Sequence, residues 1–370
     1  MKYYILAGEA SGDLHGSNLM KALQKEDANA TFRFWGGDLM EAVGGTLVKH
    51  YKERAFMGFT EVIMNLSKIF KLIAFCKEDI KNFNPDALIF IDNSGFNLRI
   101  AKWAKEAGFR TNYYISPQVW ASRAGRVESI KRDIDAMYVI LPFVKPFYEK
   151  YNYEVHFVGH PLIGAIANRD QIDESEFRKT YNISDKPIIA LLPGSRKQEI
   201  KKMLTVMLSL VDDFPKYQFV IAGAPSQEYS FYKQFIRTDQ VKFIPNKTYD
   251  LLSISHAALV TSGTATLETA LFKVPQVVCY KGSTISYHIA KRIITLKFIS
   301  LVNLVMDKEV VTELIQHDFN KKRLKLELQN ILTSERRTKV FEDYHNLEKA
   351  LGGKGASENT AKLIYESVKS

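Results

Sequence analysis

Several apolar runs in this sequence end on small or polar residues whose types suit chemistry. Asp92 follows directly on the apolar run 88–91, so it leaves a predicted buried strand for a loop. Burial raises the pKa of a carboxylate toward neutral pH, which suits a general base. The same position also suits a cap of the helix predicted over 96–105, and the sequence leaves both roles open.

Two further stretches have the order of strand, small-residue turn and helix that binds anions. In LLPGSRKQEI, residues 191–200, an arginine stands at the expected helix start, where its guanidinium can neutralise a diphosphate. In SGTATLETA, residues 262–270, a glutamate one helical turn further on can accept both hydroxyls of a ribose. Together they predict a nucleoside diphosphate site formed by Gly194, Ser195, Arg196, Ser262, Gly263, Thr264 and Glu268. A capped helix with an ordinary surface glutamate is the alternative for the second stretch, and Lys197, Lys201 and Lys202 are interpreted as solvated charges.

Other strand ends supply weaker candidates for substrate contacts. The loop GEASGD, residues 8–13, can approach a substrate closely, although a tight strand–helix turn explains it equally well. The stretch ISPQVWASR, residues 115–123, offers a flat tryptophan surface for a sugar or acyl group, with simple packing as the alternative. The candidates are Gly8, Ser11, Gly12, Gln118 and Trp120. His15 is interpreted as a helix-surface histidine and is the next candidate base after Asp92, whereas a structural and a functional role are both open for His160.

Short apolar runs alternate with amphipathic stretches along the chain, a pattern typical of parallel sheets with helices on both faces. The predicted strands form two series: 3–7, 32–35, 87–92, 111–115, 137–140 and 155–158, then 188–192, 218–222, 241–244, 258–261 and 276–280. Twisted sheets rarely exceed about 10 strands, so we predict two α/β domains rather than one sheet. Ligands of such sheets bind at the carboxyl ends of the strands, which predicts a cleft between the domains.

The composition excludes several classes of protein. The chain has 370 residues, a net charge of +10 and two cysteines, Cys76 and Cys279, without a nearby partner, so we expect no metal site and no disulfide framework. We find no signal peptide and no apolar run of about 18 residues that could span a membrane, so the cytoplasm is the expected compartment. The basic excess lies late, with 12 basic and 6 acidic residues over 281–341. A basic surface suits phosphorylated substrates or anionic lipid, and no nucleic-acid-binding motif is present.

The motifs AGEASGD, SPQVWASR, FVGHPL, LLPGSR, SGTATLE and LVNL follow one another along the chain. In this order they resemble the lipid A disaccharide synthase family over nearly the whole chain. The resemblance implies the GT-B architecture, two Rossmann-like domains whose parallel sheets face an interdomain cleft. We expect an N-terminal domain on the acceptor and membrane side over 1–165 and a C-terminal donor domain over 166–345. The last helices, 346–370, are expected to pack back on the first domain or on a partner subunit.

The resemblance also implies a reaction that joins two acylated glucosamines. The donor is UDP-2,3-diacylglucosamine, the acceptor is 2,3-diacylglucosamine 1-phosphate (lipid X), and the products are the β-1,6-linked lipid A disaccharide 1-phosphate and UDP. The transfer inverts the anomeric carbon and needs no metal or other cofactor. The implied setting is lipopolysaccharide synthesis by a peripheral protein on the cytoplasmic face of the inner membrane, in which a homodimer is permitted and nucleic acid has no part.

Individual roles carry over residue by residue. Asp92 matches the proposed base for the acceptor 6-hydroxyl, and Arg196 matches the arginine that stabilises charge on departing UDP. Asn303, in LVNL, matches a family asparagine near the site. The family often reads D-x-P-D-F-N where this chain reads DNSGFN, so Gly95 replaces a second carboxylate and leaves Asp92 as the lone candidate base. Ser122 stands where the family often has tryptophan, which leaves the shape of the acyl-binding wall open.

An apolar stripe with helical spacing precedes the third predicted strand. Lys68, Lys71 and Lys77 flank it. Core packing explains such a stripe by itself, but lipid substrates favour docking on an anionic membrane, which is our prediction. Its members are Phe59, Val62, Ile63, Leu66, Ile69, Phe70 and Ile73.

Three other functions are compatible with parts of the pattern. A UDP-N-acetylglucosamine 2-epimerase shares the architecture and the UDP pocket but needs no membrane face. A peptidoglycan-type glycosyltransferase would use an unacylated donor and a polyprenyl acceptor. A UDP-sugar sensor would bind UDP without turnover.

Overall fold

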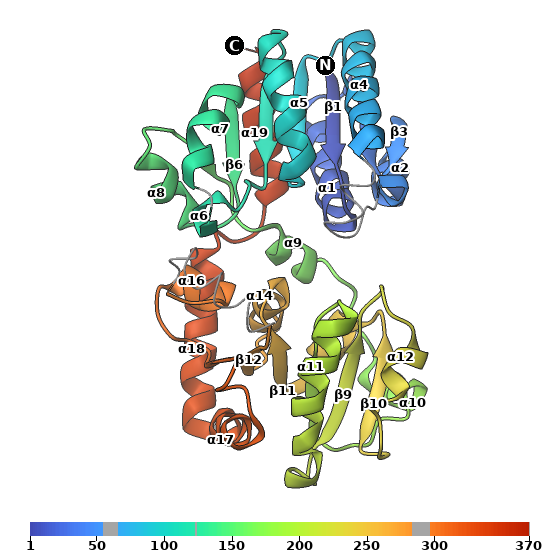
Figure 1. Ribbon diagram of the computed structural model, residues 1–370, viewed down its shortest axis with the longest axis vertical. Helices are drawn as coiled ribbons and strands as arrows, with labels where there is room; N and C mark the ends of the chain where they lie inside the picture. The colour runs from blue at the N-terminus through green and yellow to red at the C-terminus, as the bar shows by residue number, and fades with distance from the viewer. Residues whose placement is uncertain (55–65, 123, 283–296, 370) are drawn as a thin grey trace. The chain divides into compact units, whose positions relative to one another are not determined.

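The computed structural model describes residues 1–54, 66–122, 124–282 and 297–369 (Figure 1). The chain divides into two compact units, one formed by Met1–Gly164 with Leu351–Ser370 and the other by Ala165–Ala350. The predicted divisions lie at 165/166 and 345/346. In this structure the final helix belongs to the N-terminal unit.

Unit 1 is built on a seven-stranded parallel sheet with the order β3-β2-β1-β4-β5-β6-β7. Among its central strands, β4 is apolar and buried along its whole length and β1 is buried from Tyr3 onward, as parallel strands covered by helices on both faces are. The strands are β1 (Lys2–Ala7), β2 (Thr31–Gly36), β3 (Thr46–His50), β4 (Ala87–Ile91), β5 (Thr111–Tyr114), β6 (Ala136–Val139) and β7 (His156–Phe157).

Helices cover both faces of this sheet. The helices of unit 1 are α1 (Ala10–Glu26), α2 (Asp38–Val43), α4 (Leu66–Phe83), α5 (Ser94–Glu106), α6 (Val119–Ser122), α7 (Val127–Asp133), α8 (Val144–Glu149) and α19 (Ala356–Lys369), with short 3₁₀ turns at Tyr51–Arg54 and Ala124–Arg126. The helix α9 (Pro161–Ala167) contains the division between the two units. The C-terminal α19, red in Figure 1, packs against the N-terminal α1. Its Ala361 and Ile364 are fully buried in the same core as Leu19 and Leu23. The last helix therefore completes the core of unit 1.

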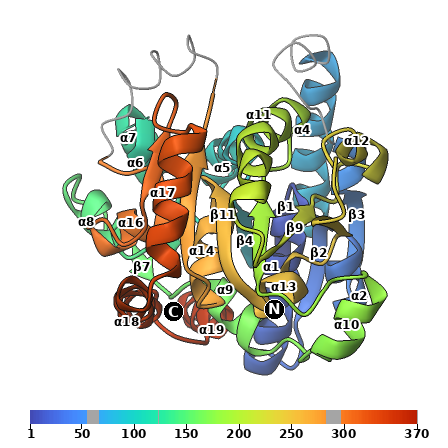
Figure 2. The ribbon, with the colours of Figure 1, turned by 90° about the horizontal axis from the view of Figure 1, so that it is seen from below.

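Unit 2 repeats the plan with a six-stranded parallel sheet in the order β10-β9-β8-β11-β12-β13. The strands are β8 (Ile188–Leu192), β9 (Gln218–Gly223), β10 (Val241–Pro245), β11 (Ser255–Thr261), β12 (Gln276–Tyr280) and β13 (Glu313–Ile315). The helices are α10 (Glu174–Thr180), α11 (Lys197–Met207), α12 (Tyr229–Lys233), α13 (Thr248–Ser253), α14 (Thr264–Leu271), α16 (Leu301–Met306), α17 (Lys321–Leu332) and α18 (Ser334–Ala350), with a 3₁₀ turn at Leu208–Asp213. Residues of α11 and α17 share one core cluster over a face of the sheet (Figure 2).

The two-domain α/β prediction is confirmed, and the eleven predicted strands are all present. The prediction missed β3 and β13, each of which lies at one edge of its sheet. The first helix, α1, begins at Ala10, inside the GEASGD motif. Every strand pair is parallel, so the carboxyl ends of all strands of a sheet lie on the same side. The loops after β1, β4 and β5 therefore lie together at the carboxyl ends of the first sheet, and those after β8, β11 and β12 at the carboxyl ends of the second.

Candidate active site

Asp92 is held in place through its backbone, at the first position after the fully buried strand β4. Its φ is +43°, in the left-handed region, and Asn93 repeats this value. The Asp92 carbonyl oxygen accepts hydrogen bonds from Asn97 Nδ2 at 2.9 Å and from the Tyr113 hydroxyl. These contacts fix the main chain and leave the carboxylate free to act on a ligand. The sequence allowed a capping role, but α5 begins after Asn93, and neither Asp92 nor Asn93 caps it through a side chain.

The protein environment raises the pKa of Asp92. Burial by the surrounding atoms is the main cause, the negative charge of Glu9 adds to it, and a hydrogen bond from the Asn93 N–H works in the opposite direction. The residue is nevertheless exposed at the surface of unit 1, so a substrate can reach it. Glu9 is thus a second carboxylate near Asp92, although Gly95 occupies the position where the family often has one.

Backbone strain gathers at the neighbouring strand end. Ile115, the first residue after β5, has a φ of +65°, which a β-branched residue rarely adopts. Its N–H donates to the Tyr138 carbonyl at 3.0 Å, which holds this conformation. Strained residues cluster at functional sites because the surrounding structure must enforce them. Three such residues, Asp92, Asn93 and Ile115, lie at the ends of two adjacent strands.

The loop after β1 reaches this cluster through Gly8. A β-carbon at Gly8 would lie 2.0 Å from Asn93 Nδ2, so the position requires glycine. Gly12 is buried, and its β-carbon would lie 3.2 Å from that of Ala7, which gives it a packing role between α1 and β1. Ser11 is exposed in the first turn of α1 and stays a candidate for substrate contact.

The aspartate of the GEASGD motif has a structural task that the sequence did not reveal. Asp13 is buried, and its Oδ1 accepts from the N–H groups of Gly37 at 2.8 Å and Met40 at 3.0 Å. Its Oδ2 accepts from the Leu39 N–H at 3.1 Å. The carboxylate therefore satisfies the first N–H groups of α2, which would otherwise have no partner.

Gln118 and Trp120 follow β5 on the same sheet edge. Trp120 is half-buried, and its ring packs edge-on against Phe143 with centroids 4.8 Å apart. This is the packing role that the sequence left open, with part of the ring still accessible. Gln118 is exposed and stays a candidate.

Burial favours the neutral form of two histidines of unit 1, His15 and His160. Burial lowers the pKa of His15 to about 4 and that of His160 to about 3, and mutual repulsion adds to the shift of His160. The His160 N–H donates to the Leu351 carbonyl at 2.9 Å, where the returning chain enters unit 1. His160 Nδ1 also accepts from the Leu162 N–H at 3.3 Å, which favours the structural one of the two roles left open for it, whereas buried His15 Nδ1 has no partner among the described residues.

In unit 2, the loop after β8 is braced on both sides around Gly194, whose φ is +97°. Ser195 N–H donates to Glu199 Oε2 at 3.2 Å, and Ser195 O accepts from Ser226 Oγ at 3.0 Å and Gln227 Nε2 at 3.1 Å. Arg196 follows as the exposed N-cap of α11, and no carboxylate of the described residues pairs with it. A rigid loop thus presents an unpaired guanidinium at the carboxyl edge of the sheet.

The loop after β11 leads into α14. Ser262 Oγ donates to the Ile299 carbonyl at 2.8 Å, which fixes the loop, while Gly263 and Thr264 are exposed. No described acceptor takes the N–H groups of residues 263–265, so the start of α14 offers free donors to an anion. Since β8 and β11 are adjacent, Arg196 and this helix start lie on neighbouring strand ends.

Glu268 lies one turn into α14 and is oriented by a partner that the sequence did not identify. The Tyr249 hydroxyl donates to Glu268 Oε1 at 2.9 Å. Burial raises the pKa of Glu268, and the bond from Tyr249 opposes that rise. Tyr249 also lines a cavity of about 310 Å³ at the ends of β9 and β10, with Pro225, Asn246, Lys247, Thr248 and Asp250. A base-sized space therefore lies next to the ribose acceptor candidate.

Asn303 does not reach the surface of unit 2. It is fully buried, its Nδ2 donates to Val311 O at 2.8 Å and to Glu313 Oε1 at 2.9 Å, and its Oδ1 accepts from the N–H groups of Val310 and Val311. All hydrogen-bonding capacity of the amide is used, so no group is left for a substrate. The predicted substrate contact is corrected to a positioning role.

That role extends to the diphosphate loop through Glu313. The Glu313 carboxylate also accepts from the N–H groups of Ile299 and Ser300, each at 2.9 Å. Ile299 in turn holds Ser262 through its carbonyl. A chain of hydrogen bonds therefore connects the edge strand β13 to the start of α14.

The predicted membrane stripe is only partly within the described residues. Phe59, Val62 and Ile63 lie outside them, as does the side chain of Leu66. Ile69 and Ile73 are half-buried, and the same helical face continues into the fully buried Cys76 and Ile80, so this face is core. The exposed apolar side chains of α4 are Phe70, 65 % exposed, and Phe75, 46 % exposed. No described helix is long and apolar enough to cross a bilayer.

Comparison with known proteins agrees with this arrangement. The family model of lipid-A-disaccharide synthetases matches residues 3–367. A lipid-A-disaccharide synthase of Syntrophus aciditrophicus is 39 % identical over 373 residues, 99 % of this chain and 97 % of that protein. The chain belongs to the lipid-A-disaccharide synthase family. It is thus a glycosyltransferase of lipid A biosynthesis, and the family implies lipid-linked sugar substrates.

Further relatives cover the same length. The lipid-A-disaccharide synthases of Geobacter metallireducens and Coxiella burnetii strain CbuG_Q212 are 38 % and 36 % identical, over 98 % of this chain and 96 % and 98 % of their own lengths. Among solved structures, a co-structure of S. aureus MnaA with UDP matches with a TM-score of 0.72 at 14 % identity, covering 100 % of this chain and 97 % of that chain. The UDP-GlcNAc 2-epimerase of Neisseria meningitidis matches with a TM-score of 0.70 at 13 % identity, covering 100 % of both chains. These structural matches confirm the predicted GT-B fold of two Rossmann-like domains.

Proposed function

We propose that this member of the family transfers 2,3-diacylglucosamine from its UDP donor to the 6-hydroxyl of 2,3-diacylglucosamine 1-phosphate with inversion. The observation that carries the proposal is Asp92, an accessible carboxylate with a raised pKa, held by a strained backbone at a strand end. A general base needs these properties. The diphosphate cradle of unit 2, formed by Arg196 and the start of α14, would stabilise the departing UDP.

On the donor side, Arg196 and the start of α14 bind the diphosphate. The guanidinium and the free N–H groups of residues 263–265 neutralise the charge that grows on UDP as the anomeric C–O bond breaks. Glu268, oriented by Tyr249, accepts the ribose hydroxyls, and the adjacent cavity of about 310 Å³ takes the uracil ring. These side chains and N–H groups perform the charge stabilisation in the proposed reaction.

On the acceptor side, Asp92 takes the proton of the 6-hydroxyl as that oxygen attacks the anomeric carbon. One C–O bond forms, the bond from the sugar to the diphosphate breaks, and the proton stays on Asp92 until solvent removes it. The charge of Glu9 favours this transfer because it raises the proton affinity of Asp92. Gly8 permits the close approach of Asn93 that completes the loop.

The decisive experiment is an assay of the purified full chain with both acylated sugars, and with each omitted in turn. We expect the disaccharide 1-phosphate and UDP to form in equal amounts only when both are present. The anomeric coupling of the product in an NMR spectrum would report inversion. Epimerised sugar from UDP-N-acetylglucosamine alone would replace this proposal by the epimerase, whose fold is shared. Product from an unacylated donor with a polyprenyl acceptor would indicate the peptidoglycan-type transferase, and UDP binding without turnover the sensor.

We also propose that unit 1 docks peripherally on the cytoplasmic face of the inner membrane through the exposed side of α4. Phe70 and Phe75 supply the apolar contact, and Lys68 and Lys71 are exposed beside them. Changing both phenylalanines to glutamate should weaken binding to anionic vesicles and leave the melting temperature unchanged. Leu326→Glu with Phe341→Glu, at exposed apolar positions of unit 2, is the matched control. Equal vesicle binding by the α4 variant and the wild type would reject this surface.

A further inference from the structure

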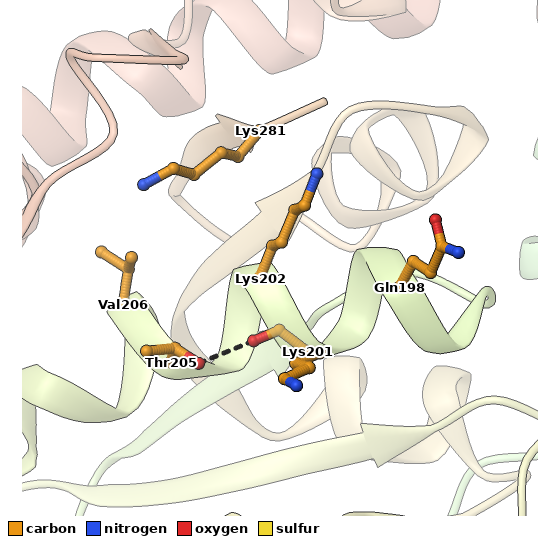
Figure 3. A pocket seen from close by; sticks show the side chains of 6 residues that line it. All are labelled: Gln198, Lys201, Lys202, Thr205, Val206 and Lys281. Carbon is orange, nitrogen blue, oxygen red and sulfur yellow. Dashed lines mark hydrogen bonds between the residues drawn. The ribbon is translucent and has the colours of Figure 1, made fainter. Parts of the chain in front are cut away.

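A cavity of about 460 Å³ in unit 2 brings together three lysines from two separate segments (Figure 3). Lys201 and Lys202 lie on α11, and Lys281 is the first residue after β12, 79 positions later in the chain than Lys202. The remaining lining residues are Gln198, Thr205 and Val206. The sequence alone gave Lys201 and Lys202 no role beyond solvated charge.

The chemistry of this cavity is cationic at its edge and apolar on its walls. The walls are formed by the aliphatic stems of the lysines with Val206, and in Figure 3 the amines of Lys202 and Lys281 extend over the space above α11. None of the described residues that line the cavity carries a carboxylate. Glu199, the acidic residue of α11, is bound instead to the Ser195 N–H. An anion that carries an apolar portion matches such a surface.

Several lysines of unit 2 have a counter-ion among the described residues. Lys273, Lys308 and Lys325 each bind a carboxylate at 2.5 to 2.6 Å. No carboxylate of the described residues pairs with the three lysines of the cavity. A bound anion would supply the counter-charge that these ammonium groups lack among the described residues.

The sequence that follows β12 is also basic and apolar. From Lys281 to Lys297 it contains four cations, the other two being Lys291 and Arg292, and no aspartate or glutamate. Apolar residues occupy much of the remainder. A basic and apolar composition of this kind is typical of segments that contact anionic lipid.

We propose that the cavity between α11 and Lys281 binds the phosphate headgroup of an anionic phospholipid, and so gives unit 2 its own contact with the membrane. The lysine amines bind the phosphate, and the glycerol and the first methylenes of the acyl chains pack against Val206 and the lysine stems. None of the residues that line the cavity belongs to the diphosphate cradle, although Arg196 is the N-cap of α11, which carries Lys201 and Lys202.

Binding of the full-length chain to vesicles tests the proposal. The variant Lys201→Gln, Lys202→Gln, Lys281→Gln removes the charge and keeps side chains of similar shape. A lysine near an anionic bilayer contributes about a fivefold change in binding, so the triple variant should bind vesicles containing phosphatidylglycerol about 100-fold more weakly. Binding to phosphatidylcholine alone should change little, and UDP affinity and the melting temperature should stay as in the wild type.

The matched control is Lys179→Gln, Lys216→Gln, Lys339→Gln, which makes the same change in net charge at exposed positions of unit 2. An equal loss in both triple variants would show diffuse attraction and overturn the site, as would undiminished binding of the cavity variant. Thr205→Glu places a carboxylate at the cavity and should weaken vesicle binding with every lysine kept. If inorganic phosphate displaced the protein from vesicles at concentrations where chloride of equal ionic strength did not, the site would be one for free phosphate and the lipid assignment would be wrong.

Discussion

Replacing Asp92 by asparagine removes the proton acceptor and leaves its surroundings nearly unchanged. The hydrogen bonds that hold this residue, from Asn97 and Tyr113, go to its carbonyl oxygen and survive the change. Asparagine tolerates the left-handed backbone well, and Asn93 already adopts it next door. The variant is therefore a chemical test with little structural disturbance.

The expected loss follows from the role of the side chain. A positioned general base contributes about 10²–10⁴ to the rate, which corresponds to about 2.7–5.5 kcal/mol of activation free energy. UDP affinity should stay within about twofold of the wild type, because all proposed UDP contacts come from unit 2. The melting temperature should also be preserved.

The assay is steady-state formation of the disaccharide product across a range of pH. Only the ionised carboxylate accepts a proton, so kcat/KM of the wild type falls as the pH drops through the raised pKa of Asp92. Removing the neighbouring charge with Glu9→Gln lowers that pKa, so the acidic limb should move to lower pH. In Asp92→Asn this limb should disappear.

Two results would refute this reasoning. Full activity of Asp92→Asn would exclude it as the base and turn attention to His15, which is neutral at physiological pH. An acidic limb that stays in place in Glu9→Gln would show that Glu9 does not act on the catalytic carboxylate. Glu358→Gln, on the exposed side of α19, controls for the general loss of a negative charge from unit 1.

Other changes test the donor side and the scaffold. Arg196→Ala should lower UDP affinity about 10- to 100-fold and should lower kcat as well. Arg196→Lys should be intermediate, because lysine keeps the charge but lacks the planar guanidinium. If calorimetry gave an unchanged Kd for UDP, Arg196 would not belong to the diphosphate site. Glu313→Gln replaces one oxygen that accepts from the Ile299 and Ser300 N–H groups by an amide NH₂ group, which cannot accept a hydrogen bond. KM for the UDP-sugar should therefore rise about tenfold, with a smaller change in kcat. A roughly tenfold fall in kcat with KM unchanged would contradict a positioning role. Asp13→Asn should lower the free energy of unfolding, measured by denaturant titration, by about 1–3 kcal/mol and should not affect UDP binding. Unchanged stability would show that the three hydrogen bonds of Asp13 are dispensable.

The central strands could be predicted because their apolar runs are long and uninterrupted. β4 and β8 are five-residue runs in which every residue is buried, and β8 is present at its predicted bounds. The edge strands β3 and β13 escaped prediction, since one is only half-buried and mixed in polarity and the other has three residues. Edge position alone does not explain the miss, because β7 and β10 are also edge strands and were predicted.

The site residues also differ in how far the sequence could predict them. Asp92, Arg196 and Glu268 could be selected from the sequence because each stands at a fixed offset from a strand end, and strand ends are local features. Asn303 has an equally specific motif, but its buried amide is bound entirely to the backbone and to Glu313. Motif matching reports that a residue matters, and only packing shows whether it faces a ligand or the core.

By itself the sequence determined the two-domain α/β plan, the family and the strand ends that carry the chemistry, because these depend on local periodicity and on residues at short range. Tertiary structure alone decided that Glu9 influences Asp92, that Tyr249 orients Glu268 and that Lys281 joins Lys201 and Lys202 around one cavity. It also decided which face of α4 is buried. The physical reason is that pKa shifts, hydrogen bonds between distant segments and burial all depend on distances in space, and those distances are set only when the sheet brings separate loops to one edge.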